Sequence, residues 1–149
     1  TLAVASSIRL PCSIERTPDK AAARKQMLET ITTIGPKIRS ANIFIQQYGG
    51  APVKLAVLPE YFLTSYPGRI SIPDFADKAA LEVDGPEYEA LGKIAQDQKL
   101  FLAGNAYEAD KNFPGLYFQT SFVVAPNGNV VLRYRRLNSM FAPFLTLTA

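Results

Sequence analysis

The sequence contains no histidine and only one cysteine, Cys12. Without histidine the chain cannot form histidine-ligated metal sites, histidine general bases or serine-histidine-aspartate triads. One cysteine cannot form an internal disulfide. These absences exclude many classes of enzyme, and we expect neither a metal nor another cofactor.

Long apolar runs are also missing, so no segment has the sequence of a membrane span. The start, Thr1-Leu2-Ala3-Val4-Ala5, has no basic residues before its apolar part, so it predicts a strand and not a signal peptide. We expect a cytoplasmic protein with no membrane partner.

The composition is that of an ordinary globular domain, with 48% hydrophobic and 19% charged residues in a chain of 149. This length is enough for one domain with a real core. The net charge of +3 is mild, and we expect no nucleic-acid partner. Acidic residues are absent from 111–149, where the basic residues are mostly one cluster, Arg133, Arg135 and Arg136.

The first third of the chain predicts a strand followed by a helical region. Leu2–Leu10 is the predicted strand, and Thr17-Pro18-Asp19 has the residues that open a helix, with Thr17 as the N-cap. An apolar stripe at helical spacing follows: Met27, Ile31, Ile34 and Ile38. Gly35-Pro36 interrupts the stripe and predicts a kink or two helices.

The remainder predicts strands, a helix and a hairpin. The strands are Val53–Leu58, Leu100–Ala106, Tyr117–Ala125 and Val130–Arg136, and a helix runs from Gly85-Pro86-Glu87 to about Asp97. Asn127-Gly128 between two apolar runs is typical of a hairpin turn. The order predicts an α/β domain with a mixed sheet and helices mostly on one face.

Glu60 is the first candidate for chemistry, because it directly follows the strand Val53–Leu58 and Pro59. In open α/β sheets, ligands bind beyond the carboxyl ends of strands, so a general base could stand there, and we expect the Glu60 side chain to face a concave pocket and not bulk water. Position alone favours the simpler interpretation, in which Pro59-Glu60 opens a solvated loop.

Three motifs in order resemble the nitrilase superfamily, the carbon–nitrogen hydrolases. They are Leu58-Pro59-Glu60 through Tyr66-Pro67, Leu102-Ala103-Gly104 through Glu108, and Leu116-Tyr117-Phe118-Gln119-Thr120 with Asn127-Gly128 and Tyr134-Arg135-Arg136. The resemblance runs from Leu2 to about Met140. It implies an α-β-β-α sandwich, of which this chain supplies roughly one half, and we expect residues 1–149 to be a single domain truncated at its C-terminus.

The resemblance also implies a mechanism in which a glutamate, a lysine and a cysteine cleave an amide or a nitrile through a thioester. Glu60 takes the place of the glutamate base, and Arg136 stands at the lysine position, where an oxyanion could still be held. Of Arg135 and Arg136, only one can reach the pocket, because they point to opposite strand faces, and we expect Arg136 to be the one that points toward Glu60. Glu108 and Tyr66 are expected in supporting roles, although Glu108 could equally be a structural hydrogen-bond acceptor.

The catalytic cysteine of the superfamily has no counterpart here. Cys12 follows the first predicted strand, not the Tyr-Arg-Arg motif, and is more simply a small half-buried thiol. The arginine cluster, taken without the resemblance, would be a solvated hairpin end. The last residues, Phe144-Leu145-Thr146-Leu147-Thr148-Ala149, fit a truncation, a change of reading frame or a strand with another packing.

Two functional hypotheses follow. In the first, the chain is part of a hydrolase for a small amide or nitrile, inactive alone. In the second, it is a non-catalytic half-domain that associates with another chain, and in both we expect a homo-oligomer. An exposed sheet face would drive association, and its candidate residues are Val4, Leu55, Val57, Phe101, Phe122 and Val124. A nucleotide- or nucleic-acid-binding module is a weak third alternative, because no glycine-rich phosphate loop follows a strand.

Overall fold

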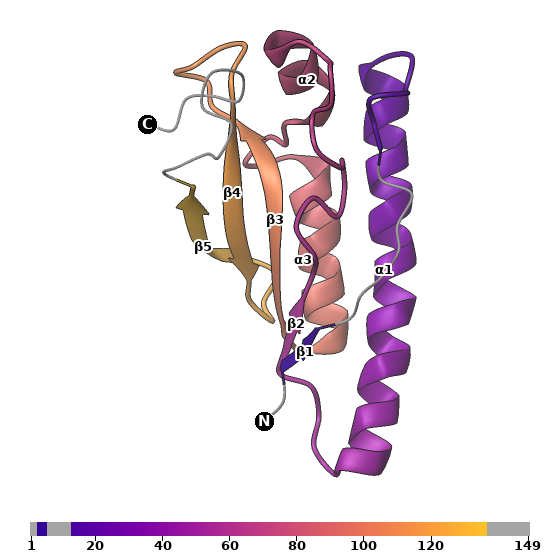
Figure 1. Cartoon of the computed structure of the whole chain (residues 1–149). Coiled ribbons are helices and arrows are strands. Elements are labelled where there is room, and N and C mark those ends of the chain that lie inside the picture. The colour runs from indigo at the N-terminus through magenta and orange to yellow at the C-terminus, as the bar shows by residue number, and fades with distance from the viewer. Residues whose placement is uncertain (1–2, 6–12, 137–149) are drawn as a thin grey trace.

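The fold is a mixed five-stranded sheet with helices on one side (Figure 1). A computed structural model describes residues 3–5 and 13–136. The strands follow one another in the order β1-β2-β3-β4-β5, with β1, β2 and β3 parallel and β4 and β5 antiparallel to their neighbours. The expected α/β class with a mixed sheet is confirmed.

Most predicted elements are present with shifted ends. The strands are β1 (Ala3–Ala5), β2 (Leu55–Val57), β3 (Phe101–Ala109), β4 (Tyr117–Val124) and β5 (Val130–Arg135). The helices are α1 (Lys20–Gly49), α2 (Ile72–Ala79) and α3 (Pro86–Gln98). Of the predicted first strand Leu2–Leu10, only Ala3–Ala5 falls within the described residues. The predicted β4–β5 hairpin is confirmed, and Gly128 adopts a positive φ of 87° in its turn.

Helix α1 corrects two predictions. It is a single helix of 30 residues with Pro36 inside it, so of the two alternatives, a kink or two helices, the second is wrong. Ile31, Ile34 and Ile38 on both sides of the proline are buried. Tertiary packing of such a stripe can outweigh the roughly 3 kcal/mol that an interior proline costs. The N-cap is Asp19 and not Thr17, because the Asp19 carboxylate accepts the Ala22 N–H at 2.8 Å.

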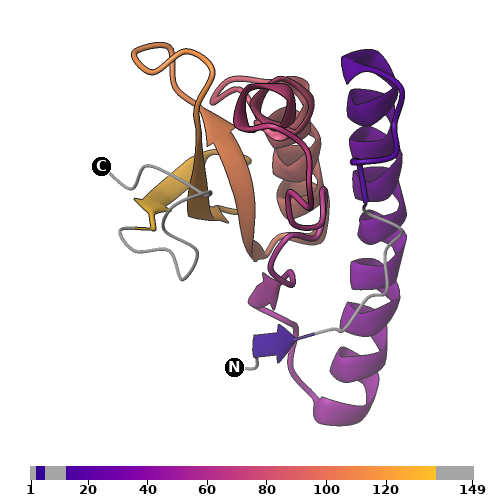
Figure 2. The same cartoon turned by 45° about the horizontal axis from the view of Figure 1, so that its top comes forward.

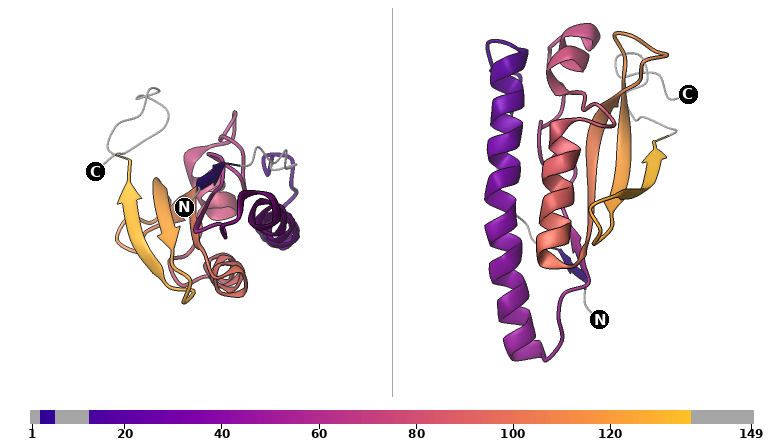
Figure 3. Two further views of the ribbon diagram at one scale, coloured as in Figure 1. Left: turned by 90° about the horizontal axis from the view of Figure 1, so that it is seen from below. Right: turned by 180° about the vertical axis from the view of Figure 1, so that it is seen from behind.

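All three helices lie on the same side of the sheet, as the views from below and from behind show (Figure 3). Helix α3 packs against β3 and β4, and α1 packs against α2 and α3. The core lies between these helices and the sheet. Its largest fully buried side chains include Met27, Ile31, Ile34, Phe62, Phe75, Leu81, Leu91, Leu102 and Phe122.

No described helix covers the opposite side of the sheet, which we call the open face (Figure 2). The register places Val57 beside Ala103, Ala103 beside Val123, and Val123 beside Leu132. This row is apolar, and Val57 and Leu132 are 38% and 49% exposed. Phe101, in register with Leu55, is 43% exposed.

Two residues predicted for the exposed face lie on the other side. Phe122 and Val124 are buried beneath the helices, at 1% and 0% exposure. Side chains alternate along a strand, and Phe122 contacts Tyr88 of α3 edge to face at 5.1 Å, which fixes its side. Position 123 of β4 therefore faces outward. The side chain of Val4 lies outside the described residues.

Candidate active site

Glu60 lies just past the carboxyl end of β2, an interior strand of the sheet. The chain continues in register with β3 after the strand, because the Leu58 N–H donates to the Ala103 carbonyl at 2.8 Å. Tyr61 follows with a positive φ of 56°, a strained conformation for a residue with a bulky side chain. Phe62 and Leu63 are buried and anchor the loop. Glu60 is thus held by a tightly fixed turn.

The side chain of Glu60 faces the open side of the sheet and is 54% exposed. We expected it to face a concave pocket, away from bulk water. That expectation is wrong for the chain as described, because no described helix lies over this face.

Gln119 of β4 and Arg136, which follows β5, meet Glu60 on the open face. The Gln119 Nε2 donates to Glu60 Oε1 at 2.6 Å, and Arg136 Nη1 donates to Gln119 Oε1 at 2.9 Å. Arg136 Nη1 also lies 3.5 Å from Glu60 Oε1. Three elements far apart in sequence therefore bring a carboxylate, an amide and a guanidinium into one cluster.

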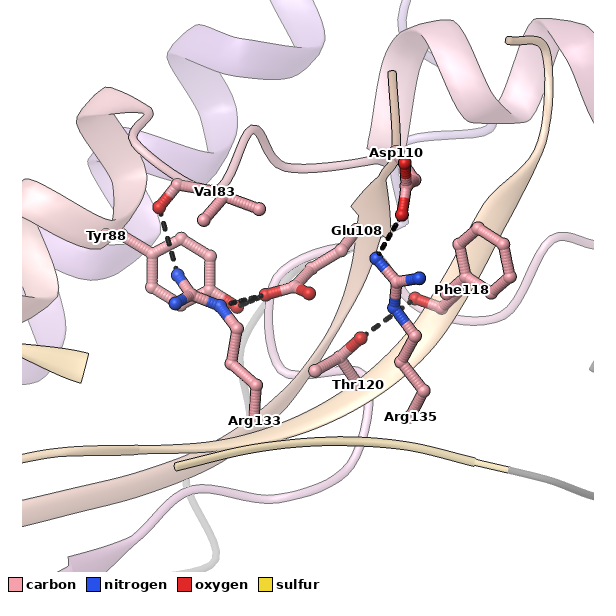
Figure 4. Close-up of polar contacts among 8 residues, drawn as sticks. All are labelled: Val83, Tyr88, Glu108, Asp110, Phe118, Thr120, Arg133 and Arg135. Atoms are coloured by element: carbon pink, nitrogen blue, oxygen red, sulfur yellow. Dashed lines mark hydrogen bonds and ion pairs between the residues drawn. The ribbon is translucent and has the colours of Figure 1, made fainter. Parts of the chain in front are cut away.

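The choice of Arg136 over Arg135 as the residue facing Glu60 is confirmed in its geometry. Arg135 lies on the helix side, where its Nη2 donates to Asp110 Oδ2 at 2.7 Å and its guanidinium covers the Phe118 ring (Figure 4). The Arg136 backbone N–H instead donates to the Gln119 carbonyl at 2.9 Å. Arg136 therefore lies beside Gln119 of β4, whereas Arg135 is paired with Thr120. The strand alternation that separates the two arginines is the one expected.

Glu108 lies on the helix side of the sheet, opposite to Glu60. It is 1% exposed, accepts a hydrogen bond from the Tyr88 hydroxyl, and accepts one from Arg133 Nε at 3.0 Å (Figure 4). Arg133 also covers the Tyr88 ring at 4.7 Å. Of the two roles left open for Glu108, this geometry fits the structural acceptor, because the sheet separates it from Glu60.

Tyrosines surround the base of the Glu60 loop. Tyr61 stacks on Tyr107 at 5.5 Å, and Tyr107 meets Tyr117 edge to face at 5.0 Å. Burial, with the neighbouring Tyr61, raises the pKa of Tyr117 to about 12. Burial also raises the pKa of Tyr107, and the nearby Tyr61 and the Glu60 charge act in the same direction. Both phenols therefore stay neutral at physiological pH.

The remaining candidates are not brought to this cluster. Tyr66 is 67% exposed, and no contact within residues 13–136 joins it to Glu60. Cys12 lies outside the described residues. Sequence reasoning did not single out Gln119 as a site residue, although Gln119 lies within the motif Leu116-Tyr117-Phe118-Gln119-Thr120. Its partner Asn105 was not singled out either. The Asn105 Oδ1 accepts a hydrogen bond from Gln119 Nε2 at 3.1 Å.

Neither a metal-binding cluster nor a spanning helix is found in the part of the chain that the structure describes. Within it, no three histidine, cysteine, aspartate or glutamate side chains are grouped to hold a metal ion. None of the described helices is both long and apolar enough to cross a membrane.

Comparison with known proteins connects the sequence and the fold to the carbon-nitrogen hydrolases. The carbon-nitrogen hydrolase family matches residues 9–144. A hydrolase from Schizosaccharomyces pombe is 30% identical over 82 residues, which cover 55% of this chain and 24% of that protein. The chain thus spans about a quarter of this curated relative.

Solved structures share the fold at low identity. An N-terminal amidase with a Gln-Gly peptide matches with a TM-score of 0.61 and 19% identity, over 93% of this chain and 28% of the amidase. Nit3 of Saccharomyces cerevisiae, a member of the nitrilase superfamily, matches with a TM-score of 0.58 and 22% identity, over 88% and 42% of the two chains.

A CN-hydrolase superfamily protein of Xanthomonas campestris, solved with an arsenic adduct in its active site, has a TM-score of 0.54 and 19% identity, over 87% of this chain and 39% of that one. The family match covers most of the sequence, and the chain belongs to the carbon-nitrogen hydrolase family. The resemblance to the nitrilase superfamily is confirmed, and the chain is a fragment of the full fold.

Proposed function

We propose that this chain supplies the base and the cation of a hydrolase that cleaves the carbon–nitrogen bond of a small, non-peptide amide or nitrile. The observation that carries the proposal is the Glu60–Gln119–Arg136 cluster on the open face. Glu60 is held in place by the Gln119 amide, which donates to its Oε1 at 2.6 Å, and a carboxylate in a fixed position can act as a general base.

For an amide, the reaction needs a cysteine thiol, which we propose comes from a segment other than the 149 residues here. Glu60 takes the S–H proton, the sulfur bonds to the carbonyl carbon, and the carbonyl π electrons move to oxygen. The Arg136 guanidinium stabilises that oxyanion. Glu60 then gives its proton to the nitrogen as the C–N bond breaks, and ammonia leaves.

Hydrolysis of the thioester completes the cycle. Glu60 takes a proton from water, the hydroxide oxygen bonds to the acyl carbon, and the proton returns to sulfur as the C–S bond breaks. Arginine in place of lysine keeps the positive charge throughout, since a guanidinium does not act as a proton donor in proteins. Proton transfer in this scheme therefore belongs to Glu60 alone.

The test measures ammonia release from a panel of small amides and nitriles by the protein as cells make it, with any chain that it holds. We expect Glu60→Gln to lower the rate by about 10²–10⁴-fold and Arg136→Gln by about 10²–10³-fold. Glu82→Gln, a change at an exposed carboxylate, is the control. Activity that survives Glu60→Gln would remove Glu60 from the mechanism.

The purified 149-residue chain should release no ammonia, because loss of the nucleophile from such a unit removes nearly all of the rate. Cys12→Ala is the matched variant, since Cys12 is the only thiol in the sequence. Ammonia release by the chain alone that disappears in Cys12→Ala would show that Cys12 is the nucleophile and that no second segment is needed.

A second candidate function is association without catalysis, which the exposed apolar side chains of the open face favour. In that case the native protein releases no ammonia in any variant, yet the chain is found bound to a partner or to itself. Small-molecule amide or nitrile substrates, a homo-oligomeric state and a cytoplasmic location all remain proposals.

A further inference from the structure

Gln119 contacts both charged members of the cluster more closely than they contact each other. Its amide lies 2.6 Å from Glu60 Oε1 and 2.9 Å from Arg136 Nη1, whereas the direct Arg136–Glu60 distance is 3.5 Å. The direct pair is partly exposed on both sides, and such pairs contribute little on their own. The main connection between base and cation therefore passes through Gln119.

The orientation of the Gln119 amide follows from its three partners. Its NH₂ group faces two acceptors, Glu60 Oε1 and Asn105 Oδ1, and its oxygen faces the Arg136 donor. A flipped amide would set its oxygen against two acceptors and its NH₂ group against a cation. The hydrogen bonds thus select one orientation.

The surroundings of Gln119 hold it in this place. Its strand β4 lies between β3 and β5, and its carbonyl accepts the Arg136 backbone N–H at 2.9 Å. Asn105 is fixed in turn, since its Nδ2 donates to Ser121 Oγ at 3.3 Å. Arg136 is thus anchored to Gln119 by both its backbone N–H and its side chain.

We propose that Gln119 is a positioning residue that couples the Glu60 carboxylate to the Arg136 guanidinium. Its NH₂ group holds the Glu60 carboxylate by a hydrogen bond, and its oxygen directs the guanidinium toward the same point on the open face. This inference rests on the proposed function, because it gives Gln119 its role through Glu60 and Arg136. Gln119 itself does not touch the reacting atoms.

The test measures the coupling between Glu60 and Arg136 by NMR and does not depend on enzymatic activity. The Nε–Hε resonance of Arg136 is followed by ¹⁵N NMR in four proteins: the unchanged chain, Glu60→Gln, Gln119→Leu and the double variant. We expect Glu60→Gln to shift the Arg136 resonance in the unchanged chain and to shift it much less when Gln119 is leucine, because only the direct contact at 3.5 Å then remains. Gln47→Leu, at an exposed position of α1, is the matched control and should preserve the response.

A purely structural role for Gln119 gives a different result: Gln119→Leu would lower the stability while the Arg136 response to Glu60→Gln remained. That outcome would overturn the inference, and so would an Arg136 resonance that ignores Glu60→Gln in the unchanged chain. If Gln119→Leu does not fold, Gln119→Met takes its place in the same comparison. A failure of the proposed hydrolase activity would leave this readout unaffected, so the two can be told apart.

Discussion

At the scale of single residues, alternation along β5 divides three arginines between two different tasks. Arg133 and Arg135 face the helices and pair with Glu108 and Asp110, whereas Arg136 faces Glu60. The sequence could predict this division, because neighbouring strand residues point to opposite faces. It could not predict Gln119 as the link, because Gln119 and Glu60 are 59 positions apart and only the folded register joins them.

The buried Glu108 offers a test of the helix-side cluster. We expect Glu108→Gln to lower the free energy of unfolding by about 1–3 kcal/mol, because Arg133 loses its charged acceptor and the amide fits the Tyr88 hydroxyl less well. Urea denaturation followed by circular dichroism measures the change. Glu89→Gln on the exposed side of α3 should stay within about 0.5 kcal/mol, and an equal effect of both changes would contradict the assignment.

Tyr117 gives a prediction on the alkaline side. Its pKa is raised from 10.0 to about 12 in the fold, so the unfolded chain loses this proton first as the pH rises. The stability that its neutral form contributes is complete below about pH 10 and is lost between about pH 10 and 12. We expect Tyr117→Phe to reduce the fall of the unfolding free energy over this range, measured by urea denaturation at several pH values. Tyr48→Phe, at an exposed position, should leave the fall unchanged, and equal slopes for all three chains would contradict the prediction.

At the scale of elements, features that depend on residue spacing within one helix or turn could be predicted from the sequence. Features that depend on packing between elements could not. The Asn127-Gly128 turn and the apolar stripe of α1 follow from local spacing alone. The continuity of α1 through Pro36 does not, because it depends on burial against other elements. Phe122 and Val124 were assigned to the wrong face for the same reason, since the neighbouring Val123, which faces the other side, is apolar as well.

The close approach of α3 to the β4–β5 hairpin can be tested through two glycines. A Cβ on Gly92 would lie 2.6 Å from the Gly128 carbonyl oxygen, so we expect Gly92→Ala to cost about 1–3 kcal/mol of stability. A Cβ on Gly35 of α1 would meet Ile94 at an ordinary 3.5 Å, and Gly35→Ala should be neutral or stabilise by up to about 1 kcal/mol. Thermal denaturation of the two variants compares them directly. A stabilising Gly92→Ala would show that the hairpin is not held this closely.

At the scale of the whole molecule, the chain has one covered and one open sheet face. Relatives of the same family are longer: the chain spans 24% of the Schizosaccharomyces pombe hydrolase and 42% of Nit3. The exposed apolar residues of the open face, Val57, Phe101 and Leu132, lie on the same face of the sheet as the Glu60 cluster. Whatever covers that face would also exclude water from Glu60 and Arg136, and their interaction would then strengthen.

The last prediction concerns what covers the open face when the chain is alone. Burying Phe101 and Leu132 is worth up to roughly 1.5–3 kcal/mol each, so we expect the chain to self-associate through this face. Sedimentation velocity at micromolar concentration should show species larger than 16.3 kDa. Phe101→Lys combined with Leu132→Lys should shift the chain toward the monomer, whereas Phe44→Lys on the exposed side of α1 should not. A compact monomer in the unchanged chain, with no dye-binding apolar surface, would show that the open face needs no partner; monomerisation by Phe44→Lys would instead place the contact on α1.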